Sequence, residues 1–398
     1  MVIVTVNDDL LDFIHDSLEN TIFDYPILSE KILSYLIRTD DGSYTINSNS
    51  VDSNSETMHT NKGAISESFE KFLNPINLDF NKDLHVLDLC SGLGYNAAAL
   101  IDSFSKSDGA GELYLDLVEI SLETIIAGLL VPSPIMAHGI IKKAISIKLL
   151  EEGLLSEPII HEDILDIPDN ININIYLDDA RRIIKNLSED YYDIIFLDSF
   201  SPKLVPELYS LHLVSEFKRV IKTDGVIITY TSSAPYISAL VFNGFFIGES
   251  PAFGRKSGGT LASLNSDNIC SDISSNDERM IALSDAGIPF LDEYLDSNSE
   301  EIKSRRTNMR KNARGTIKIS SAVKTPTYIG KDIDKENLKR RVLRNLNKIG
   351  LDNLKSKKAI YLIEPQTDKK YKNSRDRILE MEKRLNKHIK KINNEKIN

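Results

Sequence analysis

Acidic residues recur where apolar stretches of this chain end. Asp88 lies within the apolar run of residues 84–89, and Glu119, Asp179 and Asp198 each close or follow a later run. The carboxyl ends of parallel strands meet at one edge of a sheet, where carboxylates can hold a nucleoside by accepting hydrogen bonds from ribose hydroxyls and an adenine amino group. A further carboxylate beside a reacting group can accept its proton.

A turn with two glycines follows the first apolar run. Residues 84–96 read LHVLDLCSGLGYN, with Gly92 and Gly94 between an expected strand and a helix that begins near Tyr95. A Cβ at either glycine would block the turn dihedrals and the approach of a ligand to the backbone N–H groups. Such a turn can also bind nothing. The third glycine of the dinucleotide fingerprint is absent, so S-adenosylmethionine, which has no pyrophosphate, fits better than NAD or FAD.

The stretch 193–202, DIIFLDSFSP, places Asp198 at the end of another expected strand, before a loop rich in Ser and Pro. There a methyl acceptor would meet the sulfonium of S-adenosylmethionine. Spacing alone slightly favours the plainer interpretation, in which Asp198 only caps a helix or forms a turn.

The elements that must position these residues alternate between strand and helix. Residues 84–264 form this core, which predicts an α/β fold with a doubly wound, mostly parallel, seven-stranded sheet. Residues 1–83 predict helices and a hairpin that pack on it. The expected strands are 84–89, 113–118, 173–177, 192–197, 226–230, 245–248 and 260–264.

Composition excludes several classes of protein. The 398 residues are 41% hydrophobic, enough for a substantial core, and no apolar run approaches the length of a membrane span. The two cysteines lie far apart, which favours a reducing compartment, and we expect a cytoplasmic protein. The seven histidines form no cluster, so no metal site is predicted.

Charge divides the chain. Residues 301–398 hold 29 Lys and Arg against 11 Asp and Glu, a net of +18, whereas the first 300 residues hold 19 against 48, a net of −29. Residues 265–300 are polar and predict a linker. A basic, mostly helical extension of this kind is typical of nucleic-acid binding, although a solvated arm that offsets the acidic body has the same composition.

Several motifs in order resemble the methyltransferase module of the MnmC group, enzymes that methylate the aminomethyl substituent of the tRNA wobble uridine. The resemblance covers about residues 36–264. Its motifs are 39–45 (TDDGSYT), Glu56 with His59, Gly63-Ala64 with Glu67, 88–96 (DLCSGLGYN), 179–181 (DAR), 196–202 (FLDSFSP), 206–208 (PEL) and 254–263 (GRKSGGTLAS).

The resemblance implies a class I, Rossmann-like methyltransferase that uses S-adenosyl-L-methionine and acts on tRNA, which the basic extension 301–398 would help to bind. Asp198 is the expected catalytic residue. The expected cofactor-binding residues are Asp88, Gly92, Gly94, Tyr95, Asn96, Glu119 (ribose), Asp179 (adenine) and Glu67. The expected substrate-binding residues are Phe200, Pro202, Tyr209, Tyr230, Arg255 and Lys256, although the aromatic rings also suit the core and the two cations also suit solvent.

The chain departs from the family at two points. Tyr209 stands where the family usually has Trp, and nothing in this sequence encodes the flavin oxidase domain of the bifunctional bacterial members. Two other functions remain open at this point. One is a small-molecule amine N-methyltransferase or an aminopropyltransferase on the same scaffold, and the other is a non-catalytic RNA-binding protein that retains the pocket.

Overall fold

The computed structural model describes residues 8–19, 23–47, 56–254 and 257–397. The chain divides into two compact units. Unit 1 comprises residues 1–208, 219–231 and 250–259, and unit 2 comprises residues 209–218, 232–249 and 260–398. The predicted contacts of Arg255 and Lys256 lie outside the described residues.

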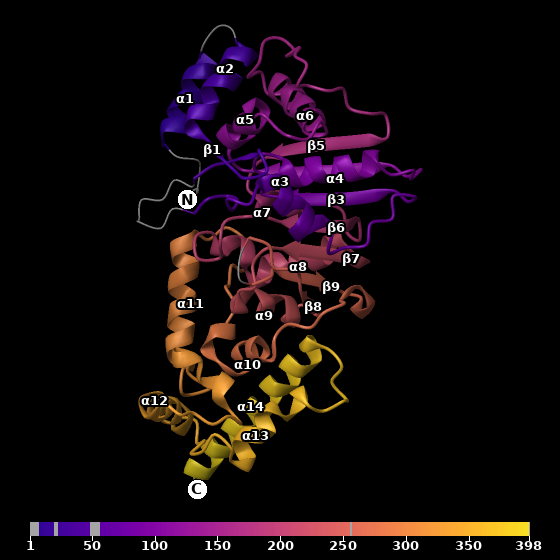
Figure 1. Ribbon diagram of the computed structural model, residues 1–398. Helices are drawn as coiled ribbons and strands as arrows, with labels where there is room; N and C mark the ends of the chain where they lie inside the picture. The colour runs from indigo at the N-terminus through magenta and orange to yellow at the C-terminus, as the bar shows by residue number, and fades with distance from the viewer. Residues whose placement is uncertain (1–7, 20–22, 48–55, 255–256, 398) are drawn as a thin grey trace. The chain divides into compact units, whose positions relative to one another are not determined.

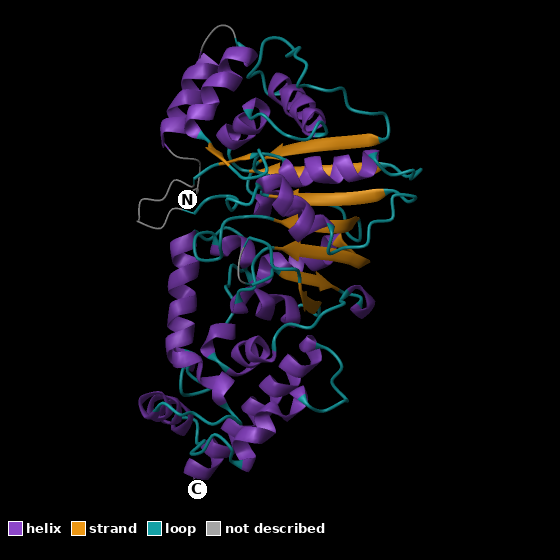
Figure 2. Ribbon diagram, viewed as in Figure 1, coloured by secondary structure: helices purple, strands orange, loops and turns teal. Residues whose placement is uncertain are grey.

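Unit 1 is built on five parallel strands, which lie side by side in Figure 2. Their order is β5-β4-β3-β6-β7. Strand β3 occupies the centre, with Val86 opposite Leu115 of β4 and Ile194 of β6. The five strands are β3 (Leu84–Leu89), β4 (Leu113–Glu119), β5 (Ile171–Leu177), β6 (Tyr192–Leu197) and β7 (Ile221–Thr229).

The helices of unit 1 lie beside its strands (Figure 1). Many of the apolar side chains of this unit are buried. They are α1 (Asp8–Glu19), α2 (Tyr25–Lys31), α3 (Ala64–Glu67), α4 (Tyr95–Ser105), α5 (Leu122–Leu130), α6 (His138–Glu151) and α7 (Ala180–Ile183). The predicted hairpin is confirmed, because β1 (Ile37–Arg38) pairs antiparallel with β2 (Tyr44–Thr45).

Unit 2 is mostly helical. Its last helix, α14 (Ser374–Ile397), buries the expected apolar stripe of Ile378, Met381, Leu385 and Ile389, none of which is more than 6% exposed. The other elements are most of α8 (Leu211–Val220), α9 (Ala234–Phe242), β8 (Phe246–Glu249), β9 (Thr260–Ser263), α10 (Ser275–Leu283), α11 (Ser299–Ala313), α12 (Glu336–Asn347) and α13 (Lys357–Ile363).

The full strand order, β5-β4-β3-β6-β7-β9-β8, confirms the predicted seven-stranded α/β sheet. Strands β8 and β9 pair antiparallel with each other. The structure differs from the predicted polar linker at 265–300. Within that stretch α10 buries Ile281, Ala282 and Leu283, and Asp285 is fully buried. These residues are part of the core of unit 2 because a few apolar positions suffice to seat a helix whose other positions are polar.

Candidate functional site

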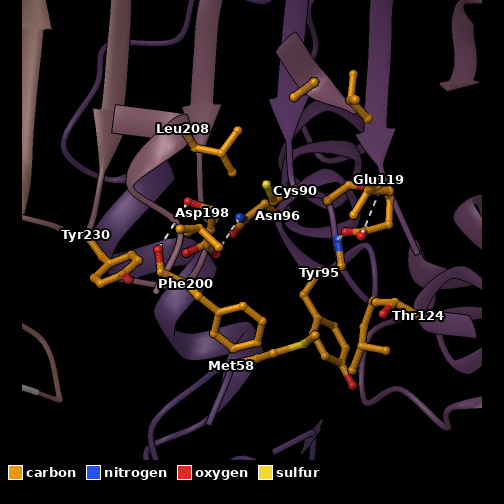
Figure 3. A pocket seen from close by; sticks show the side chains of 18 of the residues that line it. Met58, Cys90, Tyr95, Asn96, Glu119, Thr124, Asp198, Phe200, Leu208 and Tyr230 are labelled. Carbon is orange, nitrogen blue, oxygen red and sulfur yellow. Dashed lines mark hydrogen bonds between the residues drawn. The ribbon is translucent and has the colours of Figure 1, made fainter. Parts of the chain in front are cut away.

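A pocket opens in unit 1 at the carboxyl ends of β3 to β7, where the crevice of a parallel sheet was expected (Figure 3). A short segment from the N-terminal part of the chain completes its wall. The lining residues are Glu56, Thr57, Met58, His59, Cys90, Ser91, Gly92, Leu93, Tyr95, Asn96, Val118, Glu119, Ile120, Thr124, Asp178, Asp179, Ala180, Asp198, Ser199, Phe200, Val205, Glu207, Leu208 and Tyr230.

The turn after β3 brings backbone close to the pocket. Cys90, Gly92 and Gly94 all adopt positive φ, of 63°, 57° and 83°. A Cβ at Gly92 would meet nothing nearer than 3.8 Å, so this glycine leaves open space at the pocket. Gly94 instead caps α4 away from the pocket, and a Cβ there would lie 2.7 Å from Ile141. Only the first glycine is therefore placed to admit a ligand directly.

The carboxylate of Glu119, at the end of β4, is held in place by hydrogen bonds from backbone N–H groups. Its Oε2 accepts a hydrogen bond from the N–H of Gly92 at 3.0 Å, and its Oε1 accepts from Ile120 and Ser121 at 2.9 and 3.0 Å. Burial raises the pKa of this carboxyl, although the three backbone N–H groups oppose the rise. The side chain thus ties β4 to the glycine turn and lines the pocket, where its oxygens can accept from hydroxyls.

Asp179, at the end of β5, is paired with the buried guanidinium of Arg181. The Arg181 Nη2 lies 2.7 Å from Asp179 Oδ2, and the backbone N–H of Arg181 donates to Asp179 Oδ1 at 2.9 Å. The neighbouring Asp178 also lines the pocket, and its Oδ1 accepts from the N–H of Asp179 at 2.7 Å. Two fixed carboxylates therefore line this side of the pocket, one more than the sequence assigned.

Asp198 follows β6 and lies across the pocket from Glu119 (Figure 3). The side-chain amide of Asn96 donates a hydrogen bond to Asp198 Oδ2 at 2.9 Å. Asn96 is 5% exposed and comes from the first turn of α4, so the helix that follows the glycine turn also orients this carboxylate. Phe200 and Tyr230 lie near Asp198, and both line the pocket as predicted.

Asp88 is not among the residues that line the pocket. It is fully buried in β3, and neither of its carboxylate oxygens has a hydrogen-bond partner among the described residues. Burial raises its pKa well above the ordinary value, and the charges of Asp198 and Glu119 raise it further, which favours an uncharged carboxyl group. The prediction of direct cofactor contact is corrected accordingly, since Asp88 lies within β3, where the side chains on both faces of the strand are buried.

Glu67 also lies away from the pocket, where it supports one of the walls. Its Oε2 pairs with Lys71 Nζ at 2.7 Å, and its Oε1 accepts from the N–H of Thr60 at 2.7 Å and from the Thr60 hydroxyl. Burial by itself would raise the pKa of Glu67, but the charge and hydrogen bond of Lys71, the hydrogen bond of Thr60 and the charge of His59 together lower it more. Glu67 thus fixes the loop before it and does not line the pocket.

That loop, residues 56–60, contributes pocket residues that were not assigned from the sequence. Glu56 accepts hydrogen bonds from the hydroxyl and the N–H of Ser201, at 2.6 and 3.1 Å, and so fastens the loop that follows Asp198. The N–H of His59 donates to the Thr45 hydroxyl at 2.9 Å. The Glu56-x-x-His59 motif was a usable signal, as was Glu207 in the 206–208 motif. No local pattern, however, places Glu56 beside Ser201, which is 145 residues further along the chain.

Aromatic rings build the floor around Tyr95. Its ring lies 5.6 Å from that of His59 and 5.2 Å from that of His138, and its hydroxyl accepts from the N–H of Tyr44 at 3.2 Å. His138 is fully buried beside the Leu93 carbonyl, 2.7 Å from its Nε2, and burial lowers the pKa of this histidine to about 3. A neutral imidazole therefore packs beneath the glycine turn.

Two other predicted substrate residues do not line the pocket. Tyr209 is fully buried in unit 2, with its ring 5.1 Å from that of Tyr236, so it cannot stack on a base in this arrangement. Pro202 is buried in the loop after Asp198 but does not reach the pocket surface.

Among the described residues, no group of three or more His, Cys, Asp and Glu is placed to bind a metal ion. Within the same residues, every helix is too short or too polar to cross a membrane.

Comparison with known proteins supports a methyltransferase. Residues 144–265 match the family model described as S-adenosyl-L-methionine-dependent methyltransferase. The uncharacterized protein MJ0670 of Methanocaldococcus jannaschii is 35% identical over 310 residues, which cover 78% of this chain and 80% of that protein.

Two further comparisons agree. The crystal structure of MNMC2 from Aquifex aeolicus is similar with a TM-score of 0.56 and 25% identity, over 77% of this chain and all of that chain. The tRNA 5-methylaminomethyl-2-thiouridine biosynthesis bifunctional protein MnmC of Leptospira interrogans is 31% identical over 86 residues. This last match spans 22% of this chain and only 13% of the bifunctional protein.

We predict that Lys71→Met destabilises unit 1 by about 3–5 kcal/mol, because it leaves the buried Glu67 carboxylate without its cation. Lys106→Met is the matched control. It breaks another i,i+4 pair, with Asp102, but the Lys106 side chain is 74% exposed, so we expect a loss of at most about 1 kcal/mol. Urea unfolding followed by circular dichroism measures both. Equal losses in the two variants would contradict a supporting role for Glu67.

Proposed function

This chain belongs to the MnmC-like family of S-adenosyl-L-methionine-dependent methyltransferases, and from that premise we propose that it N-methylates the aminomethyl group of a modified wobble uridine in tRNA. The observation that carries the proposal is the Asp198 carboxylate, which lines the pocket and is oriented by Asn96. The substrate class comes from the similarity to the Leptospira protein, whose name states tRNA 5-methylaminomethyl-2-thiouridine biosynthesis.

The pocket residues fit S-adenosylmethionine. Gly92 leaves room that a Cβ would fill, Glu119 offers carboxylate oxygens suited to ribose hydroxyls, and Asp178 and Asp179 offer acceptors suited to an adenine amino group. The pocket lining holds six carboxylate side chains and no lysine or arginine, which suits a ligand that carries a positive sulfonium. We assign Gly92, Glu119, Asp178 and Asp179 to cofactor binding.

When bound, S-adenosylmethionine supplies a methyl group on a sulfonium, which is already a good leaving group. The work left to the protein is to position the acceptor amine and to remove its proton. An alkylamine is largely protonated near neutral pH and cannot attack in that form. We assign to Asp198 the hydrogen bond from the amine and the acceptance or relay of its proton. The same carboxylate favours the positive charge that develops on the nitrogen.

Phe200 and Tyr230 are the aromatic side chains best placed to contact a nucleotide, because both line the pocket near Asp198. Enzymes that modify RNA read bases that have left the helical stack, and such bases pack on aromatic rings. This assigns base contact to these two rings and withdraws it from Tyr209, whose ring is buried elsewhere.

We predict that Asp198→Asn lowers methyl transfer to tRNA by at least about a hundredfold, because the amide cannot take up the proton of the amine. The affinity for S-adenosylmethionine should stay within a few-fold of wild type, since the substitution keeps the shape of the side chain. Transfer is measured with labelled cofactor and affinity by calorimetry. If both fall to the same extent, Asp198 holds the cofactor and is not the base.

Asn96 is predicted to act through Asp198. Asn96→Ala should lower kcat by about ten- to a hundredfold, because the carboxylate loses the donor that orients it. A double-mutant cycle makes the test specific. If the two side chains act as one unit, the Asn96→Ala/Asp198→Asn variant is no slower than Asp198→Asn alone. If the losses in kcat of the two single variants multiply in the double variant, or if the affinity for the cofactor falls, Asn96 is instead assigned to cofactor binding.

The choice of donor separates this function from aminopropyl transfer on the same scaffold. Aminopropyl transfer requires S-adenosylmethionine that has lost its carboxylate. We predict that the protein transfers a methyl group from intact S-adenosylmethionine only when tRNA is present, and that it transfers no aminopropyl group from the decarboxylated form to polyamines. Transfer assays with each labelled donor, with bulk tRNA and with polyamines, measure this. Aminopropyl transfer to a polyamine would exclude the proposed reaction.

A further inference from the structure

The cations of the basic extension are not equivalent. Many of its arginines form hydrogen bonds or ion pairs with other residues of unit 2. Arg306 donates to the carbonyls of Ile288 and Ala286 at 2.6 and 2.8 Å, and Arg310 and Arg314 both pair with the fully buried Asp285. Others are likewise bound to acidic side chains, namely Arg377 to Glu278 and Arg384 to Glu364 and Glu380. The net charge of +18 therefore overstates what this extension can offer to a partner.

Helix α12 presents its cations differently. Arg340, Arg341 and Arg344 are exposed, and none of them forms an ion pair with an acidic side chain in the part of the chain that the structure describes. The opposite side of the helix holds it in unit 2, because Val342 and Leu346 are fully buried and Asn345 donates to the Thr325 hydroxyl at 2.9 Å. Arg340, Leu343, Arg344, Asn347 and Lys348 line a shallow surface groove.

This arrangement is unfavourable in isolation. Arg340 and Arg344 are four residues apart, as are Arg344 and Lys348, and like charges at that spacing destabilise a helix. The one acidic residue of α12, Glu336, lies in the first turn and forms no ion pair with these cations within the described part of the chain. An anionic partner with repeated charges would convert this repulsion into attraction. Arginine also suits such a partner because its planar fork binds phosphate oxygens in pairs.

We propose that the exposed face of α12 and its C-cap, defined by Arg340, Arg341, Arg344 and Lys348, is the RNA-binding surface of unit 2 and contacts the phosphate backbone of tRNA. The proposal rests on the function proposed above for the identity of the RNA. It assigns phosphate contacts, which position the RNA without reading its bases. It also separates this face from the arginines whose hydrogen bonds hold unit 2 together.

The test compares two triple variants of the full chain that lose the same charge. Arg340→Gln/Arg341→Gln/Arg344→Gln removes the three arginines of α12. Lys303→Gln/Lys355→Gln/Lys383→Gln removes three cations of the same extension that already pair with Glu300, Asp332 and Glu380. The α12 variant should bind bulk tRNA roughly ten- to a hundredfold more weakly, with the slope of log K against log salt reduced by about two to three. The control should bind nearly as wild type.

Equal losses in both variants would overturn the proposal, because net charge rather than α12 would then govern binding. Unchanged binding in the α12 variant would also overturn it. The proposal would also be overturned if the α12 variant bound tRNA as wild type does but no longer bound vesicles of phosphatidylserine and phosphatidylcholine. The partner of this face would then be a membrane surface. Circular dichroism and S-adenosylmethionine affinity report whether each variant is folded. If wild type binds tRNA through α12 but transfers no methyl group, the surface stands and the proposed reaction fails.

Discussion

Negative charge gathered at the carboxyl edge of the parallel sheet is the constraint that shapes this site. Asp88, Glu119, Asp179 and Asp198 come from neighbouring strands, and burying several carboxylates together is costly unless each is compensated. Each is compensated in a different way. Asp88 favours its uncharged form, Glu119 takes three backbone N–H groups, Asp179 pairs with Arg181, and Asp198 takes the amide of Asn96. The pocket nevertheless keeps an excess of acceptors, which suits a cationic ligand.

Much of this could be predicted from the sequence because it is local. Short apolar runs predict the strands, two glycines predict the turn, and parallel strands bring their carboxyl ends to one edge. This reasoning placed Gly92, Glu119, Asp179 and Asp198 at one pocket. The prediction failed for Asp88, because the strand that carries it is buried on both faces and its carboxylate does not reach the pocket.

What could not be predicted depends on contacts between distant segments. Glu56 reaches Ser201, and Tyr209 packs against Tyr236, and no local pattern encodes either pair. The role of Glu67 could not be predicted for the same reason, since a carboxylate near a motif can bind a ligand or fix a loop. Only the positions of Lys71 and Thr60 in the structure distinguish these two roles. Net charge has a similar limit as a guide in unit 2, where Arg310 of α11 and the following Arg314 both pair with the buried Asp285.

The turn residue Cys90 has one further consequence. Its thiol lines a pocket proposed to hold an alkylating sulfonium, so a thiolate there would compete with the amine and inactivate the enzyme by self-methylation. Burial raises the pKa of this cysteine well above its ordinary value, and the surrounding carboxylates, Glu119 first among them, raise it further. The acidic edge that favours the cationic donor therefore also keeps the Cys90 thiol in its unreactive, protonated form.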